Sequence, residues 1–196
     1  MNVLITGASK GIGKAVAEKY RKEGDHVLAP TREELNLSSV ESIDKFIKLN
    51  KNTQIDAIIN NAGINDLQKI GELSFDGIQQ TLDVNLLAPI RLINGFIDNL
   101  KRNKISWILN VSSIWAIVAK ENRLPYAITK HGINGVTKTL AVELGGANIL
   151  VNSVCPGYVD TEMTKKNVPA ETRSWLEGYI PLQRLAQPEE IAGLIY

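Results

Sequence analysis

Short apolar runs alternate with helical patterns along the whole chain. Strand-like runs occur at residues 3–5, 26–29, 34–37, 55–60, 107–111 and 148–154. Apolar residues with helical spacing fill residues 14–23, 75–100 and 125–144, and a further helix is expected to start at Pro188. Strands that alternate with helices indicate repeated βα units and a parallel sheet.

We therefore predict a doubly wound α/β fold of the Rossmann type with helices on both faces. Numbered along the chain, the six strands are expected in the order 3-2-1-4-5-6, with a ligand at the switch point. Only a few residues separate the second and third runs, whereas a crossover helix needs about a dozen. Pro89 interrupts the 75–100 pattern, and we expect a break there.

Length and composition favour one globular domain over residues 1–196. The net charge of +1 provides no overall field to attract nucleic acid or an anionic membrane. No window resembles a membrane span or a signal peptide. Cys155 is the single cysteine, so an intrachain disulfide is impossible. We expect a cytoplasmic protein without nucleic-acid or membrane partners.

A glycine-rich turn follows the first strand. The segment 6–13 reads Thr-Gly-Ala-Ser-Lys-Gly-Ile-Gly and leads into a helix. Glycines permit a tight turn and a close approach of a pyrophosphate, and the free N–H groups of the helix favour an anion. A strand, turn and helix in this order predict a dinucleotide site.

The end of the second strand bears on the choice of dinucleotide. An acidic residue there usually holds the ribose hydroxyls of NAD, but this chain has Pro30, Thr31 and Arg32. Arg32 and Lys10 could pair with a 2′-phosphate, which favours NADP(H), with NAD(H) possible. The alternative is that Arg32 only faces solvent.

Tyr126 and Lys130 are four residues apart on one face of a predicted helix. An ammonium group beside a phenol lowers the pKa of the phenol, and we expect this to make Tyr126 an acid or base near neutral pH. An exposed helix face could carry the same pair by chance.

Several motifs come in one order and spacing, and together they resemble the short-chain dehydrogenase/reductase family, most of all its 3-oxoacyl-(acyl carrier protein) reductase-like branch. They are the glycine turn, Asn60-Asn61-Ala62-Gly63, Asn85, Ser113, Tyr126, Lys130, Pro156-Gly157, Thr161 and the late segment 180–191. The resemblance spans nearly the whole chain. It implies reduction of a ketone, such as a 3-oxoacyl group, to a secondary alcohol or the reverse, in a homodimer or homotetramer.

The resemblance also implies roles for single residues. Tyr126 would exchange a proton with the substrate oxygen, Ser113 would stabilise the alkoxide, and Lys130 would hold the ribose. Asn85 would anchor a water that links Lys130 to solvent. The implied cofactor contacts are Gly7, Ser9, Lys10, Gly11, Ile12, Gly13, Arg32, Asn36, Asn61, Ala62, Gly63, Tyr126, Lys130, Pro156, Gly157 and Thr161. The implied substrate contacts are Ser113, Trp115, Tyr126 and a flap at residues 161–187, and no metal is implied.

Some features depart from the family pattern. Asn36 stands where an aspartate is common, Trp115 stands after the serine, and the family's seventh strand is missing. We therefore expect a truncated form or a partial record of a longer chain. Two other functions remain open: a nucleotide-sugar or sugar-derived ketone reductase, dehydratase or epimerase, and an inactive cofactor-binding protein.

Overall fold

The computed structural model describes residues 1–196 and centres on one parallel sheet of five strands. The strands are β1 (Asn2–Ile5), β2 (His26–Leu28), β3 (Ala57–Asn60), β4 (Ser106–Val111) and β5 (Ile149–Val154). Their order is β2-β1-β3-β4-β5, and every neighbouring pair is parallel. The predicted doubly wound α/β fold is confirmed.

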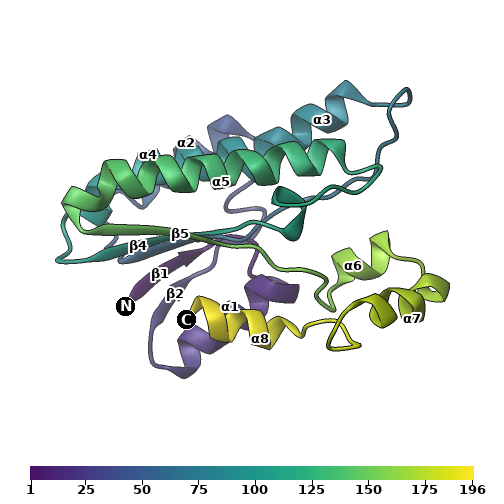
Figure 1. Cartoon of the computed structure of the whole chain (residues 1–196). Coiled ribbons are helices and arrows are strands. Elements are labelled where there is room, and N and C mark those ends of the chain that lie inside the picture. The colour runs from purple at the N-terminus through teal and green to yellow at the C-terminus, as the bar shows by residue number, and fades with distance from the viewer.

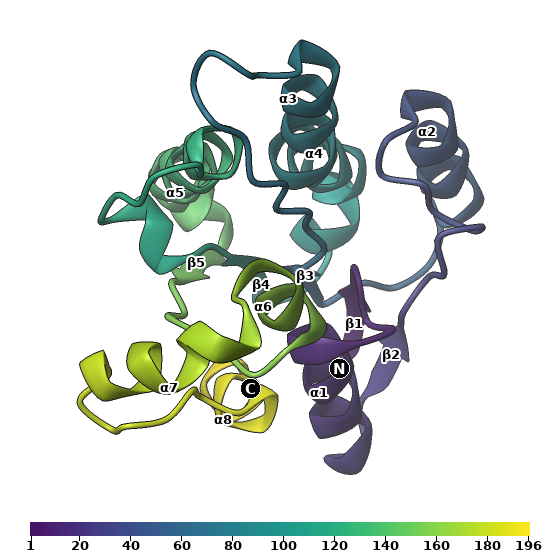
Figure 2. The same ribbon diagram turned by 90° about the vertical axis from the view of Figure 1, so that its right-hand side faces the viewer.

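Helices cover both faces of the sheet (Figure 1, Figure 2). One face carries α2 (Val40–Leu49), α3 (Phe75–Leu82), α4 (Ala88–Lys101) and α5 (Leu124–Leu144); the other carries α1 (Gly11–Lys22) and α8 (Pro188–Ile195). The side chains of successive strand residues point to opposite faces of the sheet. Leu4 packs in the core under α2 and α4, whereas Val3 and Ile5 pack in the core under α1 and α8. Both faces of the strands are therefore apolar, as a doubly covered sheet requires.

The predicted third strand at residues 34–37 is wrong. This segment is a turn in which the Leu35 N–H donates to the Thr31 carbonyl at 2.9 Å. Leu35 and Leu37 still pack on the core beneath α2, so their apolar character reflects burial without strand pairing. Two apolar residues at a spacing of two satisfied the strand pattern, although the chain was already turning into α2.

The long helical pattern before the fourth strand is interrupted as predicted, slightly before Pro89. A π-helical turn, η1 (Asp83–Leu87), joins α3 to α4, and the Ala88 N–H bonds to the carbonyl of Asp83. The wider turn accommodates the proline, which has no N–H to donate and whose ring would clash within a regular helix. Val84 and Asn85 are buried by this turn.

Short helices complete the structure. Two are 3₁₀ turns, η2 (Ile114–Ala116) after β4 and η3 (Gly145–Ala147) before β5. The predicted flap contains α6 (Glu162–Asn167) and α7 (Ala170–Tyr179), which lie beyond the carboxyl end of β5 (Figure 1). The chain contains no helix with the length and hydropathy needed to span a membrane.

Candidate active site

A cavity of about 930 Å³ lies at the carboxyl ends of the strands, between the first glycine turn and α5. It brings together nearly all the residues that the sequence indicated. Those that line it are Gly7, Ser9, Lys10, Gly11, Ile12, Gly13, Arg32, Asn36, Asn61, Ala62, Gly63, Ser113, Trp115, Tyr126, Lys130, Pro156, Gly157 and Thr161. Asn85 is the exception, and it lies just behind the lining.

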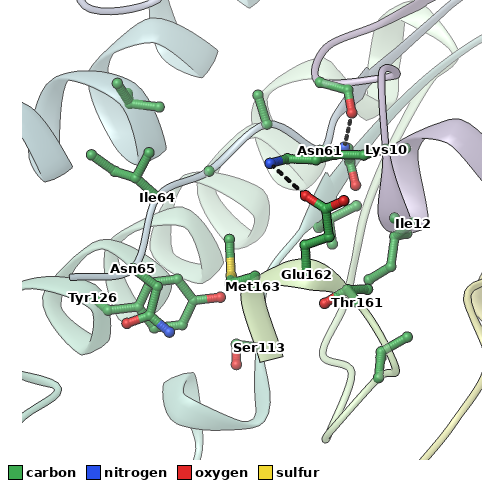
Figure 3. Close-up of a pocket in the computed structure, with 18 of the residues that line it drawn as sticks. Lys10, Ile12, Asn61, Ile64, Asn65, Ser113, Tyr126, Thr161, Glu162 and Met163 are labelled. Carbon is green, nitrogen blue, oxygen red and sulfur yellow. Dashed lines mark hydrogen bonds and ion pairs between the residues drawn. The ribbon is translucent and has the colours of Figure 1, made fainter. Parts of the chain in front are cut away.

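The glycine turn is built for close packing against the segment after β3. Gly7 has a φ of +69°, and a side chain there would lie 2.8 Å from the Ala62 Cα. At Gly13 a side chain would collide with the Gly7 carbonyl oxygen and the Asn61 amide. The Asn61 Nδ2 in turn donates to the carbonyls of Thr6 and Gly7 at 3.0 and 3.1 Å (Figure 3). The turn is therefore fixed, and its backbone is open to a ligand.

The start of α1 offers an anion site. Its first turn has no acidic residue, and its N-cap residue Lys10 forms no capping bond through its side chain. The first N–H groups of a helix have no partner within the helix and lie at the positive end of its dipole. A phosphate at the glycine turn would satisfy them, so the residues present fit a dinucleotide.

Two cations flank this end of the cavity. Arg32 is exposed, lines the cavity and forms no ion pair with a carboxylate of the chain. The Lys10 ammonium instead lies 3.1 Å from the Glu162 carboxylate of α6, which connects the glycine turn to the flap (Figure 3). The Asn36 Oδ1 accepts a hydrogen bond from the Ser38 N–H at 3.1 Å, so it organises the turn after β2.

The flap also touches the glycine turn directly. A side chain at Gly11 would lie 3.2 Å from the Thr161 methyl group. Thr161 caps α6 by accepting a hydrogen bond from the Thr164 N–H at 3.3 Å. Met163 lies over the cavity between Tyr126 and the glycine turn (Figure 3). The flap thus contributes residues to both ends of the cavity.

Buried polar contacts set the position of α5. The Asn60 Nδ2 donates to the Asn110 Oδ1, and the Asn110 Nδ2 donates to the Thr137 Oγ1, both at 2.9 Å. The Ser112 hydroxyl adds a bond to the Lys130 carbonyl at 3.2 Å. Because these side chains are buried, displacing α5 would leave polar groups unsatisfied. The ladder therefore holds Tyr126 and Lys130 against the ends of β3 and β4.

The side chains of Ser113 and Tyr126 point into the same part of the cavity (Figure 3). Ser113 lies two residues after the end of β4, and Tyr126 lies in the first turn of α5. The Lys130 ammonium donates to the Val111 carbonyl at 2.6 Å and lies 5.4 Å from the centre of the Tyr126 ring. Burial lowers the pKa of Lys130 to about 8, while the nearby Cys155 raises it.

The expected cause of a low pKa at Tyr126 is wrong for this structure. Burial raises the pKa of Tyr126 above its ordinary value, while the Ser113 hydroxyl and the Arg123 charge lower it. Burial dominates because a phenolate in a low-dielectric site loses its hydration. Tyr126 is consequently a protonated phenol at neutral pH, and the cation that lowers its pKa is Arg123.

Asn85 positions the cavity wall. Its Oδ1 accepts from the Ile64 N–H and its Nδ2 donates to the Ile64 carbonyl, each at 2.8 Å. A third bond reaches the Thr129 hydroxyl at 3.2 Å. The Asn85 amide is therefore hydrogen-bonded to protein groups. The water that the sequence resemblance implied there would have to bind to other atoms close to Asn85.

Two buried polar residues of the lining were not singled out by the sequence. Arg123 is buried, one helical turn before Tyr126, and its spacing of three was a signal that could have identified it. Asn65 is also buried, and its Oδ1 has no partner in the chain. It lines the same cavity as Tyr126, but nothing in the local sequence marked it.

The chain matches two family models and a curated relative over nearly its whole length. The family model described as enoyl-(acyl carrier protein) reductase matches residues 29–196, and the model described as short chain dehydrogenase matches residues 1–46. A 3-oxoacyl-(acyl-carrier-protein) reductase of Thermotoga maritima is 32% identical over 217 residues, which cover 98% of this chain and 87% of the relative.

Solved structures agree with the fold. A putative NAD(P)-dependent gluconate 5-dehydrogenase from Beutenbergia cavernae, with bound NADP, superposes with a TM-score of 0.92 at 29% identity, covering 99% of this chain and 87% of that one. A 4-hydroxyisoleucine dehydrogenase complexed with NADH also gives 0.92 at 28% identity, covering 99% and 88%.

Proposed function

Because the chain belongs to the short-chain dehydrogenase/reductase family and is therefore an oxidoreductase, we propose that it reduces a ketone to a secondary alcohol with NADP(H), or catalyses the reverse. The supporting observation is that Ser113 and Tyr126 line the same cavity as the glycine turn and the uncapped N-terminus of α1. When bound, the nicotinamide dinucleotide supplies or accepts the hydride.

The chain's own residues handle the proton. Tyr126 donates its phenolic proton to the substrate oxygen during reduction, and its raised pKa keeps that proton in place at neutral pH. The Ser113 hydroxyl donates a hydrogen bond to the oxygen as negative charge develops there. Arg123 stabilises the phenolate that remains, because its charge lowers the pKa of Tyr126. Oxidation uses the same groups in the opposite direction.

The remaining polar groups bind the cofactor. The free N–H groups of α1 take the pyrophosphate, and Gly7 and Gly13 leave room for it. Lys130 holds the ribose hydroxyls near Tyr126. Arg32 binds a 2′-phosphate, and it lines the cavity without an ion pair to any carboxylate of the chain, which supports a preference for NADP(H) over NAD(H).

We also propose that the protein is a homodimer or homotetramer. Apolar side chains are exposed on the outer surfaces of α4 and α5 and the turn before α4. They are Leu87, Ile90, Ile128 and Val142, and Val142 is 86% exposed. Apolar residues gathered on neighbouring helices are typical of a surface that a second subunit covers.

Two measurements test the proposed activity. A titration that follows the fluorescence of NADPH should give a saturable change on mixing with the protein, and a panel of ketones should then cause oxidation of the bound NADPH. Saturable binding with no turnover on any ketone or secondary alcohol would contradict the enzymatic function. An absence of binding to both NADPH and NADH would contradict the cofactor assignment.

A further inference from the structure

Arg123 is a buried cation inside the cavity. It is 4% exposed, lies at the N-cap of α5, and is one helical turn before Tyr126. Its guanidinium carbon lies 5.9 Å from the centre of the Trp115 ring, and Trp115 packs edge-on against Tyr158 at 5.9 Å. All three side chains line the cavity beside Ser113. The arginine is therefore fixed by aromatic packing next to the reacting groups.

No carboxylate of the chain neutralises this arginine. Burial lowers the pKa of Arg123, and the groups that raise it are the phenols of Tyr158 and Tyr126. Arginine nevertheless stays charged, because its ordinary pKa lies far above neutral pH. A buried charge without an ionic partner is unfavourable and rare unless a ligand supplies that partner.

The charges around the cavity leave few free cations. Five basic and two acidic side chains line it. Both acids are already paired, Glu162 with Lys10 and Asp66 with Lys166. Lys130 is bonded to the Val111 carbonyl. Arg32 and Arg123 remain without a partner, and Arg123 is the one beside Tyr126.

We propose that the substrate is a short oxo or hydroxy acid whose free carboxylate binds Arg123 while its reacting carbonyl or hydroxyl contacts Ser113 and Tyr126. This inference rests on the proposed oxidoreductase function. Arg123 is a specificity-determining residue in this reading, and it selects an anionic small molecule over an acyl thioester, which has no free carboxylate near its carbonyl.

The chemistry of the pocket favours a carboxylate over a phosphate. A guanidinium forms two parallel hydrogen bonds with a planar carboxylate, and one arginine balances its single charge. A phosphate near neutral pH carries up to two charges, and the substrate end has no second unengaged cation to match them. The flanking Trp115 and Tyr158 rings place apolar surface beside the guanidinium, and a lower local dielectric strengthens the ion pair.

Matched substrate pairs test this proposal. The probes are short 2-, 3- and 4-oxo acids and their methyl esters, which carry the same reacting carbonyl without the charge. With NADPH, the wild-type protein should prefer an acid to its ester by about 100-fold in kcat/KM. The Arg123→Gln variant should lower turnover on both probes through the Tyr126 phenolate, but it should lose about 100-fold more on the acid than on the ester, so that the acid-to-ester ratio falls to about one. Arg123→Lys should recover part of the acid activity, since it retains the charge without the planar fork.

Controls and a binding measurement separate the possible causes. Lys120 is exposed, donates to the Tyr158 hydroxyl at 3.1 Å and does not line the cavity. Lys120→Gln removes the same charge nearby and should leave the acid-to-ester ratio unchanged. Calorimetry on the NADP⁺-loaded protein should show that the oxo acid binds to the wild type about 100-fold more tightly than to Arg123→Gln.

Two outcomes would overturn the proposal while leaving the oxidoreductase function intact. One is NADPH-dependent reduction of esters that equals or exceeds reduction of their acids. The other is equal binding of the acid to wild type and Arg123→Gln, which would restrict Arg123 to stabilising the Tyr126 phenolate. Loss of nicotinamide dinucleotide binding by the wild-type protein would instead remove the proposed function, and this inference with it.

Discussion

The two ends of the cavity are built in different ways. The proposed cofactor end consists mainly of backbone groups: the glycine turn, the open start of α1 and the exposed cations Lys10 and Arg32. The proposed substrate end consists of buried side chains, namely Ser113, Arg123 and Tyr126. At the proposed cofactor end many N–H groups share the binding of the ligand, whereas at the proposed substrate end a few side-chain atoms carry out the reaction.

Single substitutions should therefore have unequal effects at the two ends of the cavity. Removing one hydroxyl or cation from the substrate end removes a whole function, and burial makes the loss large. The cofactor end tolerates loss of a single exposed charge, because water screens such charges and neighbouring groups share the ligand. Its weak points are the positions where backbone segments pack without room for a side chain.

The largest effect is expected at the substrate end, from Tyr126→Phe. The change removes the proton donor but keeps the ring, so turnover should fall by about 10³-fold while the Kd for NADPH changes less than about 3-fold. Steady-state kinetics and a fluorescence titration check both values. Tyr179→Phe is the control, because Tyr179 is 71% exposed and outside the cavity. Turnover within 10-fold of wild type would remove Tyr126 from its assigned role.

Lys130→Met should produce the next largest effect, in the pH dependence of stability. The pKa of Lys130 is about 8 in the folded protein and 10.5 ordinarily, so the unfolded state holds more protons between these values. The stability of wild type relative to the variant should therefore rise between pH 8 and pH 10.5, by on the order of 3 kcal/mol.

Urea unfolding at several pH values measures this change. Lys138→Met is the matched control, since Lys138 is on the exposed side of the same helix. A difference that falls as the pH rises would show that burial does not depress the pKa of Lys130.

At the cofactor end, Gly13→Ala should be the more damaging change. The new methyl group would collide with the Gly7 carbonyl and the Asn61 amide, which should cost about 2 kcal/mol in the free energy of unfolding and weaken NADPH binding. Gly135→Ala provides the contrast. It lies in α5 with no atom within 4 Å of the new methyl group, and it should be neutral or stabilising by about 0.5 kcal/mol. Equal changes in the free energy of unfolding for Gly13→Ala and Gly135→Ala would contradict the close packing of the glycine turn.

The smallest effect is expected from Arg32→Gln. Loss of an exposed cation should weaken NADPH binding by about 10-fold and leave NADH binding nearly unchanged, and the difference should shrink at high salt. Fluorescence titrations with both dinucleotides measure this, with Arg21→Gln on α1 as a control outside the cavity. The same loss for both dinucleotides would count against a 2′-phosphate contact.

The sequence predicted the cofactor end more completely than the substrate end. The glycine turn and Asn61 are neighbours of strands whose apolar runs are easy to recognise, and their positions follow once the parallel sheet is known. The turn at residues 34–37 was misread because buried Leu35 and Leu37 imitate the alternation of a strand. Periodicity reports burial, and burial is not limited to strands.

The properties of the substrate end depend on distances and dielectric that no sequence pattern carries. The spacing of Tyr126 and Lys130 placed both on one face of α5, as the structure has them. The dominant influence on the pKa of Tyr126 is burial, which became visible only when β4, α5 and the flap were assembled. Arg123 likewise looks like an ordinary surface residue in the sequence, and its significance comes from the absence of an acid around it.

The central claim is that one cavity binds a nicotinamide dinucleotide at one end and a carbonyl compound beside Tyr126 at the other. The most direct test is to reduce an oxo acid with NADPH that carries deuterium at both C4 positions and to analyse the alcohol by mass spectrometry and NMR. We expect one deuterium on the carbinol carbon with the wild-type protein, and almost none with Tyr126→Phe although NADPH still binds. An alcohol without deuterium, or equal transfer by both proteins, would contradict it.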